Sequence, residues 1–93
     1  MQEVVAFEEF TPDAAAQALR HADPVNVRIA GATAHVPTVQ HLATIMRSGC
    51  WNPHNGDPVV FDRAGKLVGG FRRMHAAIQA GVPFKTRVTR WVA

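Results

Sequence analysis

Two adjacent glycines, Gly69 and Gly70, separate a strand-like segment from a helix-like segment, and this junction constrains the fold of the chain most. Residues 55–81 read as a strand, a tight turn, a second strand and a helix that opens with Arg72 and Arg73. Glycines at the start of a helix let another group approach the backbone closely. The first N–H groups of a helix lack an intrahelical acceptor, and the helix dipole favours an anion there. The pattern therefore predicts a strand–turn–helix unit with an anion site at its centre.

Strands and helices are expected to alternate along the rest of the chain. Period-two apolar patterns and β-forming residues indicate strands, whereas helical spacing, a capping threonine and proline at the first turn indicate helices. The expected strands cover residues 4–10, 25–29, 59–62, 66–68 and 84–92, with a short extended piece near 34–36. The expected helices cover residues 12–21, 37–48 and 71–80. This order predicts an α/β (α+β) sheet with helices packed on it.

The same segment resembles the ParB/sulfiredoxin-like superfamily, in particular its short phage-borne members. The matching motifs are the lead-in Gly56-Asp57-Pro58, the hairpin over 59–68, the signature over 69–77 and the glycine-x-tryptophan that ends residues 45–51. The resemblance covers about half to two-thirds of the chain. It implies a single domain over residues 1–93, a small ParB/sulfiredoxin-like domain whose mixed sheet has about three helices packed on it.

The sequence departs from the family pattern at the positions that carry chemistry. Phe71 stands where ParB-like members usually carry a glutamate and phage-type members a glutamine, and Gly69 stands where an aspartate is often found. In ParB relatives this polar residue supports nucleotide and magnesium chemistry, which a phenyl ring cannot do. Sulfiredoxin relatives use a cysteine in this turn, whereas the one cysteine here, Cys50, lies outside it. The departures predict no catalytic residue, no metal and no cofactor.

The candidate residues for binding an anion or a nucleotide are Gly69, Gly70, Arg72, Arg73 and His75. In a functional interpretation, backbone amides and guanidinium groups hold a phosphate or carboxylate, which arginine matches bidentately. In a structural interpretation, the glycines allow close packing of strand and helix, one arginine pairs with an aspartate, and the histidine is a partly exposed surface residue. The residues alone leave both interpretations open, and Arg73 matches the most recurrent arginine of the family motif.

The charge distribution points to a partner without identifying it. The net charge is +3, and residues 63–93 contain Lys and Arg but no acidic residue. This pattern fits an anionic partner, or a basic face that the acidic N-terminal part balances within the fold. The last expected strand places Lys85, Arg87 and Trp91 on one face, which suits single-stranded nucleic acid, a protein interface or a charge-protected edge strand. The candidate partner-binding residues are Lys85, Arg87, Trp91 and Trp51.

Composition excludes several classes of protein. No apolar run approaches the ~20 residues of a membrane-spanning helix, so no membrane insertion is expected. The single cysteine excludes an internal disulfide framework and fits a reducing compartment, and Cys50 is expected to be a semi-buried structural thiol. The histidine spacing matches no metal-binding motif. These features predict a cytoplasmic protein, in the host cytoplasm if it is phage-encoded.

Three functions are consistent with the sequence, in decreasing order of preference. The first is a non-enzymatic small binding protein, phage-encoded, that acts on a host macromolecule, preferably a host protein, as a monomer or homodimer. The second is a nucleotide- or nucleic-acid-binding ParB-like module that uses the helix start at Gly69–Arg73. The third is a residual nucleotide hydrolase or kinase-like activity, against which Phe71 argues.

Overall fold

The computed structural model describes residues 2–22, 37–54 and 56–92. The strand expected over 25–29 and the extended piece near 34–36 lie outside the described residues. The remaining predicted elements are confirmed, with ends that differ from the prediction by at most two residues. The elements are β1 (Gln2–Phe10), α1 (Pro12–Arg20), α3 (Pro37–Ser48), β2 (Val59–Phe61), β3 (Leu67–Gly69), α4 (Phe71–Ala80) and β4 (Phe84–Val92).

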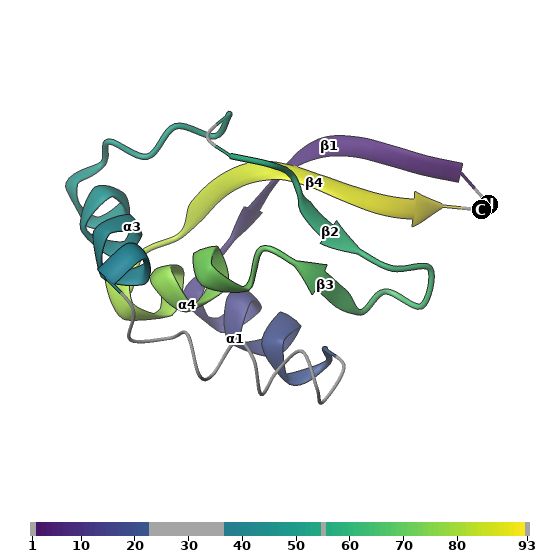
Figure 1. Cartoon of the computed structure of the whole chain (residues 1–93), viewed down its shortest axis with the longest axis horizontal. Coiled ribbons are helices and arrows are strands. Elements are labelled where there is room, and N and C mark those ends of the chain that lie inside the picture. Colours follow the sequence, from purple (N-terminus) through teal and green to yellow (C-terminus); the bar gives the residue numbers. More distant parts are fainter. Residues whose placement is uncertain (1, 23–36, 55, 93) are drawn as a thin grey trace.

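Within the described residues, the strands form one mixed sheet of four in the order β1-β4-β2-β3. β1 and β4 pair antiparallel over their whole length, from Gln2 opposite Val92 to Phe10 opposite Phe84. β2 runs parallel to β4 and antiparallel to β3. The two ends of the chain therefore lie side by side (Figure 1). The last strand, which we considered as a free edge, instead lies inside the sheet, and β1 is an edge.

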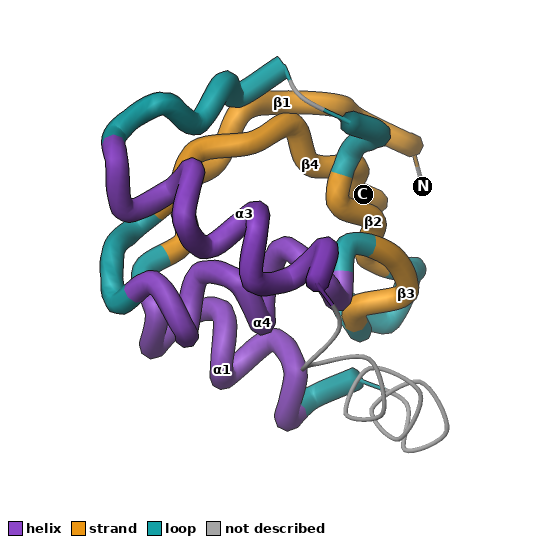
Figure 2. Tube along the Cα trace, turned by 60° about the vertical axis from the view of Figure 1, so that its left-hand side comes forward, coloured by secondary structure: helices purple, strands orange, loops and turns teal. Residues whose placement is uncertain are grey.

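The helices of the described residues lie on one face of this sheet (Figure 2). α4 packs against both α1 and α3. α1 begins where the sequence predicts, because the Thr11 hydroxyl accepts a hydrogen bond of 3.1 Å from the Ala14 N–H and caps the helix. The chain is thus a small mixed α/β domain, as its pattern of strands and helices predicts.

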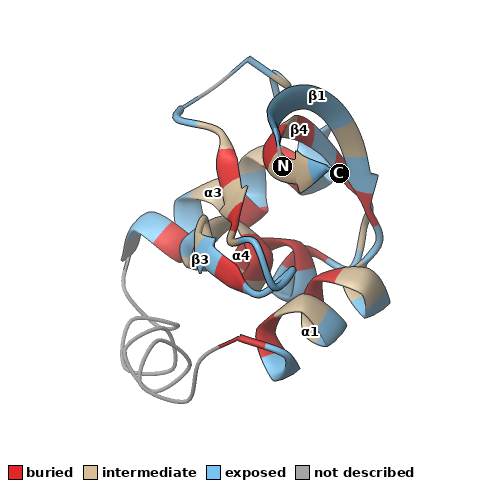
Figure 3. Ribbon diagram, turned by 90° about the vertical axis from the view of Figure 1, so that its right-hand side faces the viewer, coloured by how far each residue is buried: buried red, intermediate tan, exposed pale blue. Residues whose placement is uncertain are grey.

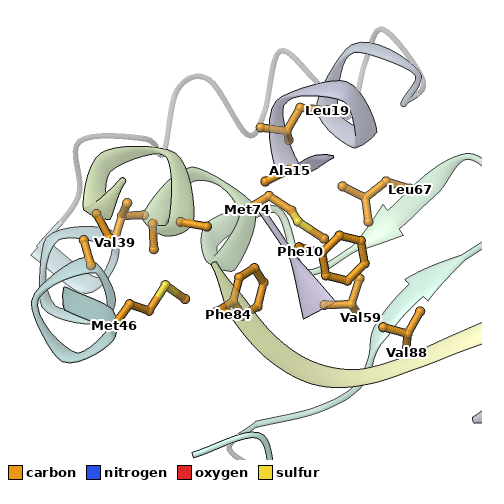
Figure 4. Close-up of a cluster of buried hydrophobic side chains, with 14 of the residues drawn as sticks. Phe10, Ala15, Leu19, Val39, Met46, Val59, Leu67, Met74, Phe84 and Val88 are labelled. Atoms are coloured by element: carbon orange, nitrogen blue, oxygen red, sulfur yellow. The ribbon is translucent and has the colours of Figure 1, made fainter. Parts of the chain in front are cut away.

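The hydrophobic core lies between the helices and the covered face of the sheet (Figure 4). Phe10 stacks against Phe61 and Phe84, with ring centroids 6.2 and 5.8 Å apart. The residues that α4 buries are Met74, Ala76, Ala77 and Ala80. Helical spacing in the sequence predicts an apolar stripe of Phe71, Met74, Ala77 and Ile78 on this helix. The prediction is partly wrong, because Ile78 is 40% exposed and Phe71 is only half-buried.

Candidate functional site

The junction that dominates the sequence is built around a tight contact between Gly70 and Val59. Gly70 has a φ of 97°, the left-handed region that favours glycine, and it caps the start of α4. A Cβ atom added to Gly70 would lie 2.8 Å from Cγ2 of Val59, and Val59 is fully buried. The glycine therefore has a packing role, since it lets the first turn of α4 press against β2.

Arg73 is directed toward the sheet. Its Nη1 donates a hydrogen bond of 3.2 Å to the hydroxyl of Thr86 on β4, which is 1% exposed. Partial burial lowers the pKa of Arg73, the Asp57 carboxylate raises it, and the positive charge of Arg87 lowers it. This guanidinium therefore supplies the hydrogen bond that the buried hydroxyl of Thr86 needs.

The other candidate residues surround the same helix start. Gly69 ends β3, Arg72 is exposed at the start of α4, and His75 is half-buried one turn later. Gly70 is the N-cap of α4, and no side-chain hydrogen bond caps this end of the helix. The structure therefore brings the predicted anion-binding residues to one helix start, with Arg73 already in contact with Thr86.

Arg87 and Trp51, predicted to contact a partner, hold the loop before β2 against β4. Nη2 of Arg87 donates hydrogen bonds to the carbonyl oxygens of Gly56 and His54, at 2.6 and 3.3 Å. Nε1 of Trp51 donates to the carbonyl oxygen of Lys85 at 2.7 Å. The ring of Trp51 also packs edge-on against Phe84, with centroids 5.7 Å apart. Both side chains thus have a role within the molecule.

Trp91 and Lys85 complete the predicted stripe on β4. The guanidinium carbon of Arg63 lies 4.6 Å from the centroid of the Trp91 ring, which links the turn between β2 and β3 to the end of β4. Lys85 is exposed and lies opposite Glu9 of β1 in the register. Among the predicted partner-binding residues, the two tryptophans and Arg87 therefore have contacts inside the domain.

The two most exposed large apolar side chains of the sheet, Val5 and Phe7, lie on β1, which the sequence prediction did not select as a site. Val4, Val5 and Phe7 are 38%, 53% and 45% exposed. The strand is exposed on both faces from Gln2 to Phe7, and Figure 3 shows it mostly pale blue. The run of apolar residues from Val4 to Phe7 is typical of a strand that is buried on both faces. That mismatch between the apolar sequence and the exposure of the strand is the signal that makes β1 a candidate binding site.

Between Val4 and Phe7, the outer edge of β1 also lacks the usual protection against strand pairing, because the charged residues of the strand, Glu3, Glu8 and Glu9, lie outside this run. Within residues 2–22, 37–54 and 56–92, β4 is the strand that pairs with β1, and none pairs with the opposite edge. The strand is nine residues long, contains neither lysine nor proline, and runs against β4 without a register shift. Natural proteins usually shield such an edge with charge, proline, a bulge or a covering segment. This edge therefore presents unpaired backbone groups between exposed apolar side chains.

Other kinds of site find no support among the described residues. There, no group of three or more His, Cys, Asp or Glu side chains is placed to hold a metal ion. The helices of that part of the chain include none that is long and apolar enough to cross a membrane. Cys50 is exposed, so the prediction of a semi-buried thiol is wrong, because α3 ends before it and the following loop leaves it at the surface.

Comparison with known proteins does not identify a relative: no family model, curated protein or solved structure matches the chain. The resemblance to the ParB/sulfiredoxin-like superfamily therefore stays a prediction. The functional inferences below depend on the contacts and exposure of this chain's own residues.

Proposed function

We propose that the chain is a non-enzymatic protein-binding domain whose binding element is the outer edge of β1. One observation carries the proposal: the apolar run Val4–Phe7 of the nine-residue strand β1 is exposed on both faces, and β4 pairs with β1 along one edge. An extended segment of another polypeptide would add to this edge as a new strand. Main-chain hydrogen bonds would supply affinity, and the alternate side chains of β1 would supply selectivity.

The side chains of β1 favour a partner strand that is largely apolar. Val5 and Phe7 share one face of the strand, whereas Val4 and Ala6 share the other. The acidic side chains near its end have cationic neighbours within the domain. Glu8 forms a bidentate ion pair with Arg90, at 2.6 and 2.8 Å, and Glu9 lies opposite Lys85. An incoming strand would therefore meet apolar side chains more than unbalanced negative charge.

The exposed free thiol of Cys50 is compatible with a reducing compartment, and we place the activity in the cytoplasm. If the phage origin that the family resemblance implies holds, a host protein is one such partner. Neither point is needed for the binding mode, which follows from the edge of β1 itself.

A second candidate function is binding of a nucleotide or nucleic acid at the start of α4. The observation in its favour is that the first turn of α4 carries exposed Arg72, no acidic residue and no side-chain cap. The backbone N–H groups in the first turn of α4 and the positive charge of Arg72 would stabilise an anion there. We rank it second because Gly70 and Arg73, its central residues, have packing and hydrogen-bonding roles inside the domain.

The proposed binding element is tested by placing a charge on the edge of β1 and, as a matched control, on the other edge of the sheet. Val5 on β1 and Val68 on β3 are both exposed valines, at 53% and 41%. We expect immobilised full-length wild type and Val68→Lys to retain the same protein partners from a lysate. Val5→Lys should lose them, because a buried lysine would disrupt strand addition. Equal retention by Val5→Lys, with an unchanged circular dichroism spectrum, would contradict the proposal.

A further inference from the structure

We propose that the strand that occupies the outer edge of β1 is β1 of a second copy, paired antiparallel about a two-fold axis that passes through Val5. This inference rests on the proposed function, because it names the occupant of that binding edge. The result is a homodimer in which two four-stranded sheets join into one continuous sheet.

The end of the β1–β4 pair needs a third strand. β2 pairs with β4 through Val88 and Thr89, so the segments 2–4 of β1 and 90–92 of β4 extend beyond this pairing as a two-stranded ribbon. Two-stranded ribbons are marginally stable in water, whereas three or more strands with an apolar face are stable. Val4 and Val92 are 38% and 44% exposed there. A second β1 would lie along this ribbon and cover part of it.

The geometry of antiparallel strands restricts the registers of such a pair. Residues directly opposite each other in an antiparallel pair point to the same face of the sheet. A two-fold axis perpendicular to the sheet carries each face of one copy onto the same face of the other. Odd-numbered residues of β1 must therefore lie opposite odd-numbered residues, and one residue of the strand must lie opposite its own copy.

Charge then selects among the allowed registers. A centre at Ala6 places Glu3 opposite Glu9 at two positions, which is destabilising. A centre at Phe7 pairs residues 4–10 and leaves Gln2 and Glu3, which belong to the two-stranded ribbon, without a third strand. A centre at Val4 leaves Phe7 beyond the described start of the partner strand.

A centre at Val5 satisfies both charge and burial. Glu3 then lies opposite Phe7, and Val4 lies opposite Ala6, so no two acidic residues are directly opposite. Val5 faces its own copy at the axis, where it is the most exposed apolar side chain of the strand, at 53%. All three exposed apolar residues of β1 lie inside the paired region.

This arrangement also closes the assembly. A two-fold contact uses the same edge on both copies, so it is satisfied by two chains. Among the described residues, the edges of the joined sheet that no strand pairs are the two copies of β3, a strand of three residues. Very short edge strands are a common protection against further pairing. The long unprotected edge is thus removed, and the short one is left exposed.

Disulfide trapping tests the register. The chain has one cysteine, so a Cys50→Ser background lets single cysteines be placed without competition. The two copies of residue 5 would have Cα atoms roughly 4.5–5.5 Å apart, within the range that a disulfide spans. We expect Val5→Cys in this background to form covalent dimers at least about tenfold faster than Phe7→Cys or the control Val68→Cys. Faster trapping of Phe7→Cys, or equal trapping of Val68→Cys, would overturn the proposed pairing.

The mass of the full chain in solution tests the pairing itself. Sedimentation equilibrium of wild type and Val68→Lys should show a species of twice the 10.1 kDa of one chain. Val5→Lys should raise the dissociation constant at least about tenfold, because each substitution occurs twice and the two charges face each other at the axis. Wild type that stays monomeric up to ~0.1 mM would overturn self-pairing, since weaker association has little specificity.

The two proposals fail in different ways. If wild type is monomeric but Val5→Lys still loses protein partners, the edge of β1 binds another polypeptide and self-pairing alone is wrong. If wild type is monomeric and Val5→Lys retains every partner, both proposals are wrong.

Discussion

The junction before α4 and the outer edge of β1 differ in how the domain uses their side chains. At the junction, Gly70 packs against Val59 and Arg73 donates a hydrogen bond to the buried hydroxyl of Thr86. On β1, Val5 and Phe7 have high exposure, and β4 is the strand of the described residues that pairs with them. The junction has the glycine and arginine residues that are typical of a binding site, whereas β1 has the exposed apolar side chains.

This difference shows that a residue type typical of binding sites is not sufficient evidence for a site. Glycine and arginine at a helix start serve ligands in many proteins, but the same residues also solve packing and hydrogen-bonding problems of the fold. On β1, Phe7 packs edge-on against His54 with ring centroids 5.0 Å apart, but Val5 is 53% exposed, so the apolar run contributes less to packing than the junction does. Substitutions at the junction should therefore change stability, and substitutions on β1 should change association.

The largest effect is expected for Gly70→Ala. A positive φ costs a non-glycine residue about 1 kcal/mol, and the contact of 2.8 Å with a fully buried, β-branched Val59 adds an overpacking cost. We expect the free energy of unfolding to fall by about 2–4 kcal/mol, as measured by urea denaturation. Gly65→Ala is the control, because its φ is +83° but no atom lies within 4 Å of the added Cβ.

The control separates the two costs at the junction. Gly65→Ala should lose only the backbone contribution, about 1 kcal/mol. Equal losses of unfolding free energy in the two variants would mean that Gly70 has no packing role. That result would favour the interpretation of the junction as a ligand site.

An intermediate effect is expected for Arg73→Ala. Removal of the guanidinium leaves the Thr86 hydroxyl buried without its donor, so the free energy of unfolding should fall by about 1–2 kcal/mol. Thr86→Val should cost a similar amount, and the double variant should cost less than the sum of the two. A double-mutant cycle by urea denaturation measures this coupling. Additive losses would contradict a structural link between the two side chains.

Local features of the fold could be predicted from the sequence, and its long-range pairing could not. The start of α1 at Thr11 and the turn that begins at Asp62 depend on neighbouring residues, and both are confirmed: the Asp62 carboxylate accepts hydrogen bonds from the N–H groups of Ala64 and Lys66 at 2.9 and 2.8 Å. The position of each strand in the sheet depends on contacts such as that between Glu8 and Arg90, which are 82 residues apart.

This long-range pairing is the reason that the exposure of β1 could not be predicted from the sequence. The alternating charges of β4 are typical of an edge strand, and the continuous apolar run of β1 is typical of a central one. The sheet order places each in the opposite role. Local pattern therefore identified both strands correctly, but it could not show which of them lies at the edge of the sheet.

No change in stability is expected from nucleotide or nucleic-acid ligands of the junction. A ligand that binds only the folded chain at about 100 times its dissociation constant would stabilise it by ~2.7 kcal/mol. We expect nucleoside triphosphates with magnesium, and short oligonucleotides, to leave the melting temperature of wild type and of Arg72→Ala unchanged. A shift in wild type that disappears in Arg72→Ala would favour the second candidate function, since Arg72 is exposed and its loss should not affect folding.

The smallest effect on the isolated domain should come from a change of valine to threonine on β1. Val5 is 53% exposed and Val88 on β4 is 1% exposed, so the same substitution compares the two strands directly. Val88→Thr buries a hydroxyl group and should lower the free energy of unfolding by about 1–3 kcal/mol. Val5→Thr keeps a β-branched side chain at the surface, so it should change the free energy of unfolding by less than about 0.5 kcal/mol in dilute solution.

For Val5→Thr and Val88→Thr, the more informative quantity is how the melting temperature depends on protein concentration. Since association stabilises the folded chain by mass action, the melting temperature of wild type should rise with protein concentration. Val88→Thr should lower the melting temperature and keep that rise, because the edge of β1 is intact. Val5→Thr should leave the dilute melting temperature almost unchanged and flatten the rise, because its hydroxyl would be buried at the two-fold axis. A rise that is unaffected by Val5→Thr would mean that association uses a surface other than the edge of β1.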